Sequence, residues 1–247
     1  MSPAVHLAAD PEGMSRAAAA HLAKALRTKP NALLCLATGA SPARTYELLA
    51  KRGRAEPSLF AQARLLKLDE WGNLPVDDPA SCEFYLRQKL IQPLRIPPER
   101  FFGWHNQPAD PAAECRRMAA WLAANGPIDV SVLGMGTNGH LGFNEPAASL
   151  QPGPHVARLS DTSLSHSMLG GSKRKVCSGL TLGMADLLHS MEIVLMVSGR
   201  HKADQMQRLF TRRITPRFPV SFLWLHPNVH LFCDRDAARL LPPEVLV

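Results

Sequence analysis

A glycine-rich stretch near the middle of the chain holds the residues best suited to acid–base chemistry. It runs from Gly134 to Pro146 and reads GMGTNGHLGFNEP. Its glycines, Gly136 among them, allow tight turns and a close approach of the backbone to a ligand. His140 is a natural proton shuttle near neutral pH, and Glu145 could orient its ring. A histidine without a catalytic role is the simpler alternative.

A second candidate is the carboxylate of Asp69, which follows the apolar run Leu65–Leu68. A carboxylate at the end of a strand, flanked by apolar residues, is a candidate general base. Burial would raise its pKa towards a useful value. The alternative is that Asp69 only caps a turn or a helix.

Two further motifs suit the binding of a phosphate. Thr38-Gly39-Ala40-Ser41 joins an apolar run to a helical segment, and a glycine turn at a helix start leaves backbone N–H groups free for an anion. Its pattern is neither GxGxxG nor the P-loop, so it does not indicate a nucleotide site. Lys202 begins another helical segment and could clamp the same phosphate. A plain strand-to-helix turn and a solvated lysine are the alternatives.

No metal site is predicted around these residues. There is no HExxH motif, and no second His or Cys lies at ligand spacing near His140. The five cysteines are dispersed without a CxxC pair, which predicts reduced thiols in a cytosol.

The candidates share a context that predicts their positions. Each follows a short apolar run and precedes a helical segment, which indicates an α/β fold with a doubly wound, mostly parallel, Rossmann-like sheet and helices on both faces. Ligands bind beyond the carboxyl ends of such strands, so we expect the candidates to converge on one edge. The expected strands are 32–37, 65–68, 130–133, 193–197 and 229–233. The expected helices are 11–27 after Asp10, 42–51 with Pro42 at its first position, 110–124 and 202–211.

Residues 149–175, called the lid segment below, interrupt this pattern with several prolines and glycines. A lid over the site and a plain surface connection are equally compatible with its composition. The whole chain of 247 residues is expected to form one domain, residues 1–247.

Charge and hydropathy narrow the possible partners. The net charge of +7 suits nucleic acid or a small anionic substrate. Aromatic residues make up only 6% of the chain, and no basic stripe interleaved with aromatics is present, which argues against nucleic acid.

The first residues have no cationic region followed by an apolar one, and no apolar run approaches about 18 residues. We therefore expect a cytoplasmic protein that is not bound to a membrane.

Four blocks occur in order between about Leu33 and Asp234: LATGASP, KLDEW, MGTNGHLGFNEPAASL and SGRHK. With them the chain resembles the glucosamine-6-phosphate deaminase/isomerase family. CLATGASP, KLDEW, GHLGFNEPAASLQP and SFLWLH are more similar to its galactosamine-6-phosphate isomerase/deaminase branch.

The resemblance implies a role for each candidate. Asp69 would move a proton between C2 and C1 of the sugar, His140 would open the pyranose ring and Glu145 would orient that histidine. The phosphate would lie on the Thr38–Ser41 loop and on Lys202. The implied partner is a small sugar phosphate, no cofactor is required, and a homo-oligomer is compatible with the resemblance.

The chain departs from the glucosamine branch at two places. Asn138 stands where the glucosamine enzymes have Asp, a change that the galactosamine branch also carries, and it removes a carboxylate near His140. In the lid segment, Ser167-Met168 replaces a serine followed by a phosphate-binding arginine. Arg174 is expected to substitute for that arginine.

The expected reaction converts galactosamine 6-phosphate to tagatose 6-phosphate and ammonium. The first alternative is glucosamine 6-phosphate, with fructose 6-phosphate as the product. A 6-phosphogluconolactonase is the next alternative, although such relatives lack the DEW and FNEPA blocks. A non-enzymatic sugar-phosphate sensor is the last, and the roughly 30 residues before the first expected strand are too few for a helix-turn-helix module.

Overall fold

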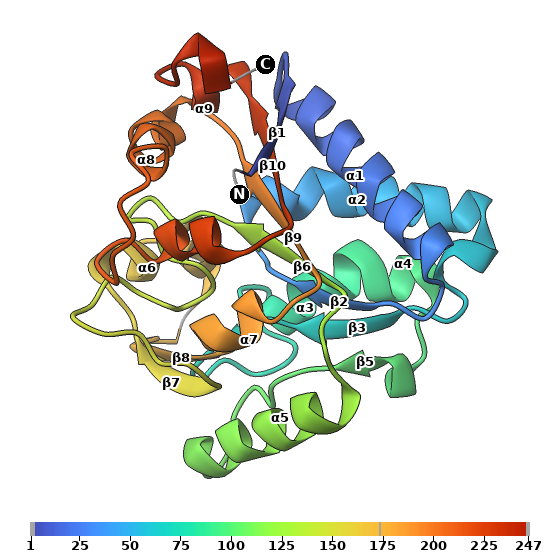
Figure 1. The fold of residues 1–247 in the computed structure, drawn as a ribbon. Helices are drawn as coiled ribbons and strands as arrows, with labels where there is room; N and C mark the ends of the chain where they lie inside the picture. Colours follow the sequence, from blue (N-terminus) through green and yellow to red (C-terminus); the bar gives the residue numbers. More distant parts are fainter. Residues whose placement is uncertain (1–2, 173, 246–247) are drawn as a thin grey trace.

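The structure is a computed structural model that describes residues 3–172 and 174–245. Its centre is a seven-stranded parallel sheet in the order β1-β10-β9-β6-β2-β3-β5 (Figure 1). The strands are β1 Ala4–Ala8, β2 Leu33–Leu36, β3 Arg64–Lys67, β5 Phe101–Phe102, β6 Val130–Gly134, β9 Glu192–Val197 and β10 Val229–Asp234. The strand order reverses between β2 and β6, so the loops that follow these two strands flank the crevice where ligands bind in such sheets.

Helices cover both faces of this sheet, as predicted (Figure 1). Asp10 caps α1 as expected, because its side chain accepts a hydrogen bond from the Gly13 N–H and a proline follows it. Asp110, expected as the first residue of a helix, instead caps α5 in the same way. The helices are α1 Pro11–Thr28, α2 Ala40–Ala55, α3 Cys82–Leu86, α4 Gln92–Leu94, α5 Pro111–Asn125, α6 Asp161–Leu164, α7 Met184–Leu188, α8 Ala203–Leu209 and α9 Arg235–Ala238.

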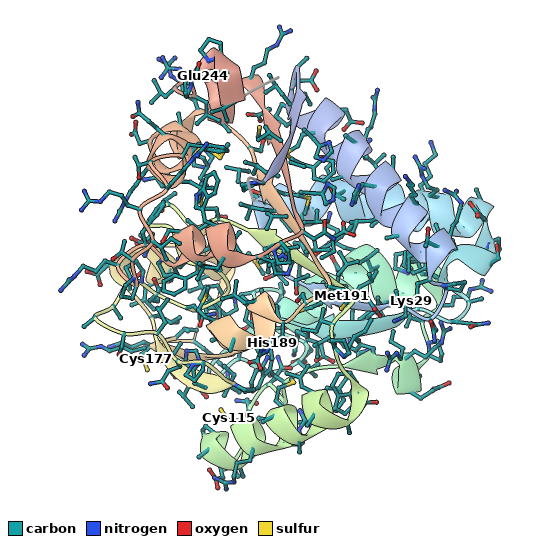
Figure 2. The ribbon with its side chains drawn as sticks, in the orientation of Figure 1. Lys29, Cys115, Cys177, His189, Met191 and Glu244 are labelled. Atoms are coloured by element: carbon teal, nitrogen blue, oxygen red, sulfur yellow. The ribbon has the colours of Figure 1, made fainter. Side chains whose placement is uncertain are left out.

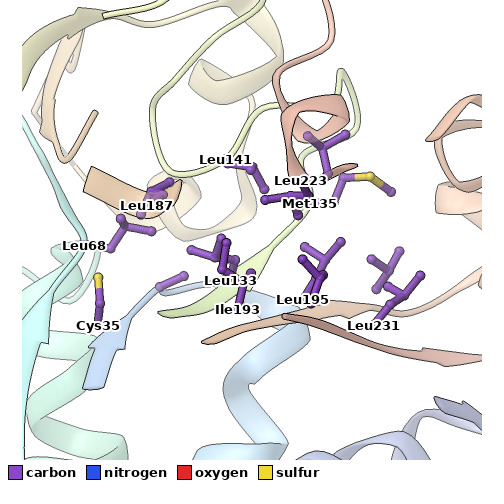
Figure 3. Packing of buried hydrophobic residues seen from close by; sticks show 14 of the residues in the cluster. Cys35, Leu68, Leu133, Met135, Leu141, Leu187, Ile193, Leu195, Leu223 and Leu231 are labelled. Atoms are coloured by element: carbon purple, nitrogen blue, oxygen red, sulfur yellow. The ribbon is translucent and has the colours of Figure 1, made fainter. Parts of the chain in front are cut away.

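The alternation of side chains along each strand divides the core into two layers. Ile193 and Leu195 of β9 pack with Leu133 and Leu231 on the side of α5, α7 and α8 (Figure 3). Val194 and its neighbours on the same face pack against α1 and α2. Burial on both faces explains why the strands read as continuous apolar runs.

A second sheet, absent from the sequence-based prediction, lies beside the first. It contains β4 Asp69–Trp71, β8 Ser178–Thr181 and β7 His155–Arg158 in the antiparallel order β4-β8-β7. The lid segment therefore forms part of this sheet, because β7 belongs to it and pairs with β8. The segment also contains the short helix α6.

Two element boundaries differ from the prediction for local reasons. Helix α2 begins at Ala40, so Pro42 is its third residue; Gly39, with φ of 115°, precedes the helix in a conformation that favours glycine. Lys202 ends a 3₁₀ turn that leads into α8, which begins at Ala203.

The cysteines are all free thiols, and Figure 2 shows Cys115 on α5 and Cys177 next to β8. None of the helices in the described part of the chain has the length and apolar character needed to cross a membrane.

Candidate active site

A cavity of about 830 Å³ lies at the carboxyl ends of β2, β6 and β9. Its size is typical of a site for a small ligand. The structure brings eight of the predicted site residues to its wall. These are Thr38, Gly39, Ala40, Ser41, Asp69, Gly136, His140 and Lys202.

Lys202 lies in the wall of the cavity with little exposure, 9%. Its Nζ donates to the carbonyl oxygen of Met135 at 2.6 Å, and burial lowers the pKa of Lys202 to about 8. The preceding loop is fixed by Asp234 at the end of β10, which accepts hydrogen bonds from the Ser198 hydroxyl and the Gly199 N–H. A buried ammonium group with a single carbonyl partner is suited to an anionic ligand.

Asp69 begins β4 and is 6% exposed. Burial, together with the negative charge of Glu70, raises the pKa of Asp69 to about 7. Within the described residues its Oδ1 atom has no hydrogen-bond partner. Gly142 allows the close packing around it, since a Cβ there would lie 3.4 Å from Asp69 Oδ2 and 2.8 Å from Thr181 Oγ1. A free carboxylate with a pKa near neutrality is suited to proton transfer.

Glu70 differs from Asp69 although it is the next residue. It is fully buried, and its Oε2 accepts from Lys67 Nζ at 2.7 Å. Lys67 also binds Glu83 Oε2 at 2.8 Å, so one buried ammonium group joins β3, β4 and α3. This network holds the strand that carries Asp69.

His140 is held by the loop that follows β6. Its Nδ1 lies 3.5 Å from Glu145 Oε2 and 3.4 Å from Ser163 Oγ. A Cβ at Gly136 would lie 2.4 Å from the imidazole, so only glycine fits beside this ring. The predicted pairing of His140 with Glu145 is present in the geometry.

Glu145 is held as a carboxylate behind His140. Its Oε2 accepts from Asn138 Nδ2 at 2.9 Å and from Ser160 Oγ at 3.0 Å, and its Oε1 accepts from Ser163. Burial alone would raise the pKa of Glu145, but the hydrogen bond and charge of His140, with the hydrogen bonds from Ser163 and Asn138, lower it to about 2. Asn138 donates to Glu145 and accepts from the backbone N–H of His140 at 3.1 Å. The sequence analysis had expected it beside the imidazole.

The lid segment contributes a residue that sequence reasoning missed. His166 lines the cavity, and its Nε2 lies 3.7 Å from the position that a Cβ would take on Gly39. Its Nδ1 accepts from Met168 N at 3.2 Å, which leaves the Nε2 edge towards the Thr38–Ser41 loop. Burial and the positive charges of His140 and Lys202 lower the pKa of His166.

Arg174, the predicted substitute for the family's lid arginine, is exposed and does not belong to the cavity wall. No motif marked His166 or Ser163, because their roles depend on how the lid segment folds back over the sheet. In residues 3–172 and 174–245, one group of His and carboxylate side chains is close enough to share a metal ion, and it lies outside this cavity.

Comparison with known proteins gives the family of this fold and site. The family model described as "Glucosamine-6-phosphate isomerases/6-phosphogluconolactonase" matches residues 9–231. "Putative deaminase AgaI" of Escherichia coli (strain K12) is 40% identical over 87% of this chain and 85% of its own length. "Glucosamine-6-phosphate deaminase 1" of Bacillus subtilis (strain 168) is 36% identical over 94% of this chain and 96% of its own.

Solved structures agree with this result. A monomeric glucosamine-6-phosphate deaminase superposes with a TM-score of 0.89 and 34% identity, covering 96% of this chain and 99% of the other. The 6-phosphogluconolactonase of Trypanosoma brucei has a TM-score of 0.79 at 19% identity over 98% and 99% of the two chains, which shows a shared fold. The chain therefore belongs to the enzyme family of glucosamine-6-phosphate isomerases and 6-phosphogluconolactonases.

Proposed function

We propose that this enzyme isomerises and deaminates an amino-hexose 6-phosphate. The observation that carries the proposal is Asp69, a buried carboxylate with a free oxygen and a pKa raised to about 7, in the same cavity as Lys202 and His140. A general base, a proton shuttle and an anion-binding cation are the groups that this reaction needs.

The phosphate would bind between the Thr38–Ser41 loop and Lys202. The first turn of α2 offers backbone N–H groups, and Lys202 Nζ would exchange its carbonyl partner for a charged one. His166 is the residue of the lid segment that would complete this contact, since Nε2 is directed towards Gly39. This assignment replaces the role first given to Arg174.

The chemistry would proceed in three steps. His140, with its Nδ1 next to Glu145, moves a proton from the O1 hydroxyl to the ring oxygen, which opens the pyranose to an aldehyde. Asp69 removes the C2 proton while a proton passes from the substrate's ammonium group to O1, which gives the enolamine, and Asp69 then returns its proton to C1. The resulting imine at C2 adds water and releases ammonium. Each positioned acid or base is worth about 10²–10⁴-fold in rate.

Within this reaction we propose galactosamine 6-phosphate as the preferred substrate and tagatose 6-phosphate as the product. The support is the similarity of CLATGASP and SFLWLH to the galactosamine branch and the departures at Asn138 and Met168. The two epimers differ only at C4, away from the proton transfers, so Asp69 and His140 do not discriminate them. Polar side chains of the lid segment that face the cavity, such as Thr162, are suited to that hydroxyl.

One assay tests both the proposed reaction and the proposed preference for the galactosamine epimer. Ammonium and ketose 6-phosphate release are measured from the galactosamine and glucosamine 6-phosphates, with 6-phosphogluconolactone hydrolysis in parallel. We expect a higher kcat/KM for the galactosamine epimer, by about 5–150-fold for each hydroxyl partner left unpaired by the other epimer. Preference for the glucosamine epimer would overturn the specificity alone. Lactone hydrolysis without ammonium release would overturn the reaction.

A further inference from the structure

A cluster of histidines lies at the opposite edge of the central sheet from the cavity. His230 is near the amino end of β10, Glu192 begins β9, His21 is in the middle of α1 and His6 is in β1. We call these four residues the histidine cluster. The active-site chemistry uses none of them, and none lines the cavity.

The side chains of the cluster converge on one point. One ligand atom from each of His21, Glu192 and His230 lies within 4.8 Å of the other two. His21 Nε2 already contacts Glu192 Oε1, and the rings of His21 and His230 have centroids 4.4 Å apart. The side chains of His21 and Glu192 are 22% and 17% exposed, so an ion could enter from solvent.

His6 supports this arrangement from the neighbouring strand. Its Nε2 lies 2.9 Å from His230 Nδ1, and its ring stacks on Phe232 with centroids 4.3 Å apart. Histidines that bind metals commonly use their second ring nitrogen in a hydrogen bond, and His6 is the partner of His230 Nδ1 here.

We propose that His21, Glu192 and His230 form a zinc site, with water as the fourth ligand and His6 as the residue that positions His230. Two imidazoles with one carboxylate suit Zn²⁺ rather than Ca²⁺ or Mg²⁺, which prefer oxygen ligands. An ion with Zn–N bonds of about 2.0–2.1 Å would replace the direct contact of His21 with Glu192, so the three ligand atoms would rearrange around it by side-chain rotation.

Such an ion would fasten helix α1 to the sheet. His21 comes from α1, whereas Glu192 and His230 come from two adjacent strands. The first turn of the same helix lies in the cavity wall, where Asp10 and Glu12 are found. The zinc site is thus a structural clamp on an element that also shapes the active site.

The test is a titration of tag-free full-length enzyme with Zn²⁺ against a chromophoric chelator. We expect one zinc per chain at this site, an affinity at least about 100-fold weaker in His21→Gln and in His230→Gln, and about 10–100-fold weaker in His6→Gln. His105→Gln is the matched control, because His105 also contacts a carboxylate, Glu114 at 2.9 Å, but belongs to no group of three ligands among the described residues. Its affinity should equal that of the wild type.

Two further measurements keep the result independent of folding defects. Saturating Zn²⁺ should raise the Tm of the wild type by about 5–10 °C but not that of Glu192→Gln. Zinc X-ray absorption of the wild type should show two imidazoles and one carboxylate. No zinc binding, or binding unchanged in the well-folded His21 and His230 variants, would overturn the proposal.

Discussion

Asp69 and Glu70 are adjacent residues with opposite surroundings. Asp69 lies in the cavity wall, whereas Glu70 belongs to the buried ion-pair network of Lys67. Both are buried, at 6% and 0% exposure. Glu70 Oε1 accepts from Trp71 N and Cys82 N, and Oε2 accepts from Glu83 N and Lys67 Nζ, whereas Asp69 Oδ1 accepts from no described residue. A buried carboxylate with all its hydrogen bonds made is a structural anchor, and one left unmatched in a cavity is free to react.

The sharpest test of this contrast is Asp69→Asn. We expect kcat to fall by about 10²–10⁴-fold, because an amide cannot take the C2 proton. The Tm should stay at or above the wild-type value, since the amide removes a buried charge next to Glu70. Turnover of both amino-sugar phosphates and thermal unfolding are the measurements. A variant with near-normal kcat would end the assignment of Asp69 as the base.

Glu70→Gln should give the reverse pattern. Breaking a buried ion pair costs about 3–5 kcal/mol of unfolding free energy, and the lower end is expected here because Lys67 keeps Glu83 as a partner. Turnover per folded molecule should change far less than the about 10²–10⁴-fold expected for loss of the base, because Glu70 does not belong to the cavity wall. Denaturant unfolding and kcat distinguish the two residues. Lost turnover at unchanged stability would make Glu70 the reacting group.

Lys202→Ala should weaken the binding of the sugar phosphate. Loss of one charged hydrogen bond to phosphate, about 1.5–3 kcal/mol, raises KM by about 10–100-fold with a smaller change in kcat. Arg174→Ala is the matched control, a cation of the lid segment outside the cavity wall, and should leave KM unchanged. If the Arg174 variant has the larger KM, the phosphate contacts are assigned to the wrong residues.

The pH dependence of kcat/KM should follow from the shifted pKa values of Asp69 and Lys202. With the pKa of Asp69 raised to about 7, kcat/KM should rise as the pH increases through 7, because the base must lose its proton. With the pKa of Lys202 lowered to about 8, kcat/KM should fall above pH 8 as the ammonium group loses its charge. Lys202→Arg should remove this basic limb if activity is retained, since guanidinium does not titrate there. An unchanged basic limb in that variant would assign it to another group.

The smallest effect on activity is expected for Asn138→Asp. The change removes the donor to Glu145 Oε2 and places a second carboxylate beside it, which raises the pKa of Glu145 from about 2. Activity at pH 7 should be retained within about tenfold, as for one hydrogen bond. A loss comparable to that of Asp69→Asn would give Asn138 a direct part in the reaction.

The sequence predicted the features that depend on local pattern. Strands β2, β3, β6, β9 and β10, the Asp10 cap and the convergence of the strand-end loops follow from apolar runs and a capping residue. Strand β4 was missed because three residues that pair with Thr181, Leu180 and Gly179 carry no periodic signal of their own. Strand β1 was missed too, so the alignment of His6 with β10 could not be foreseen. His166 was missed for a related reason, since its place depends on the fold of the lid segment.

The small antiparallel sheet has a mechanical consequence. Its three strands link β7 of the lid segment through β8 to β4, whose first residue is Asp69. Backbone hydrogen bonds therefore connect the covering segment and the base in one small sheet. Both β7 and β4 are edge strands of this sheet, but β4 is also tied to β3 by the ion pair of Lys67 and Glu70, so opening should begin at β7 and reach β4 last. Amide exchange would then form a gradient across these strands, with the base on the slow side, so that access to the cavity can vary while the proton acceptor keeps its position.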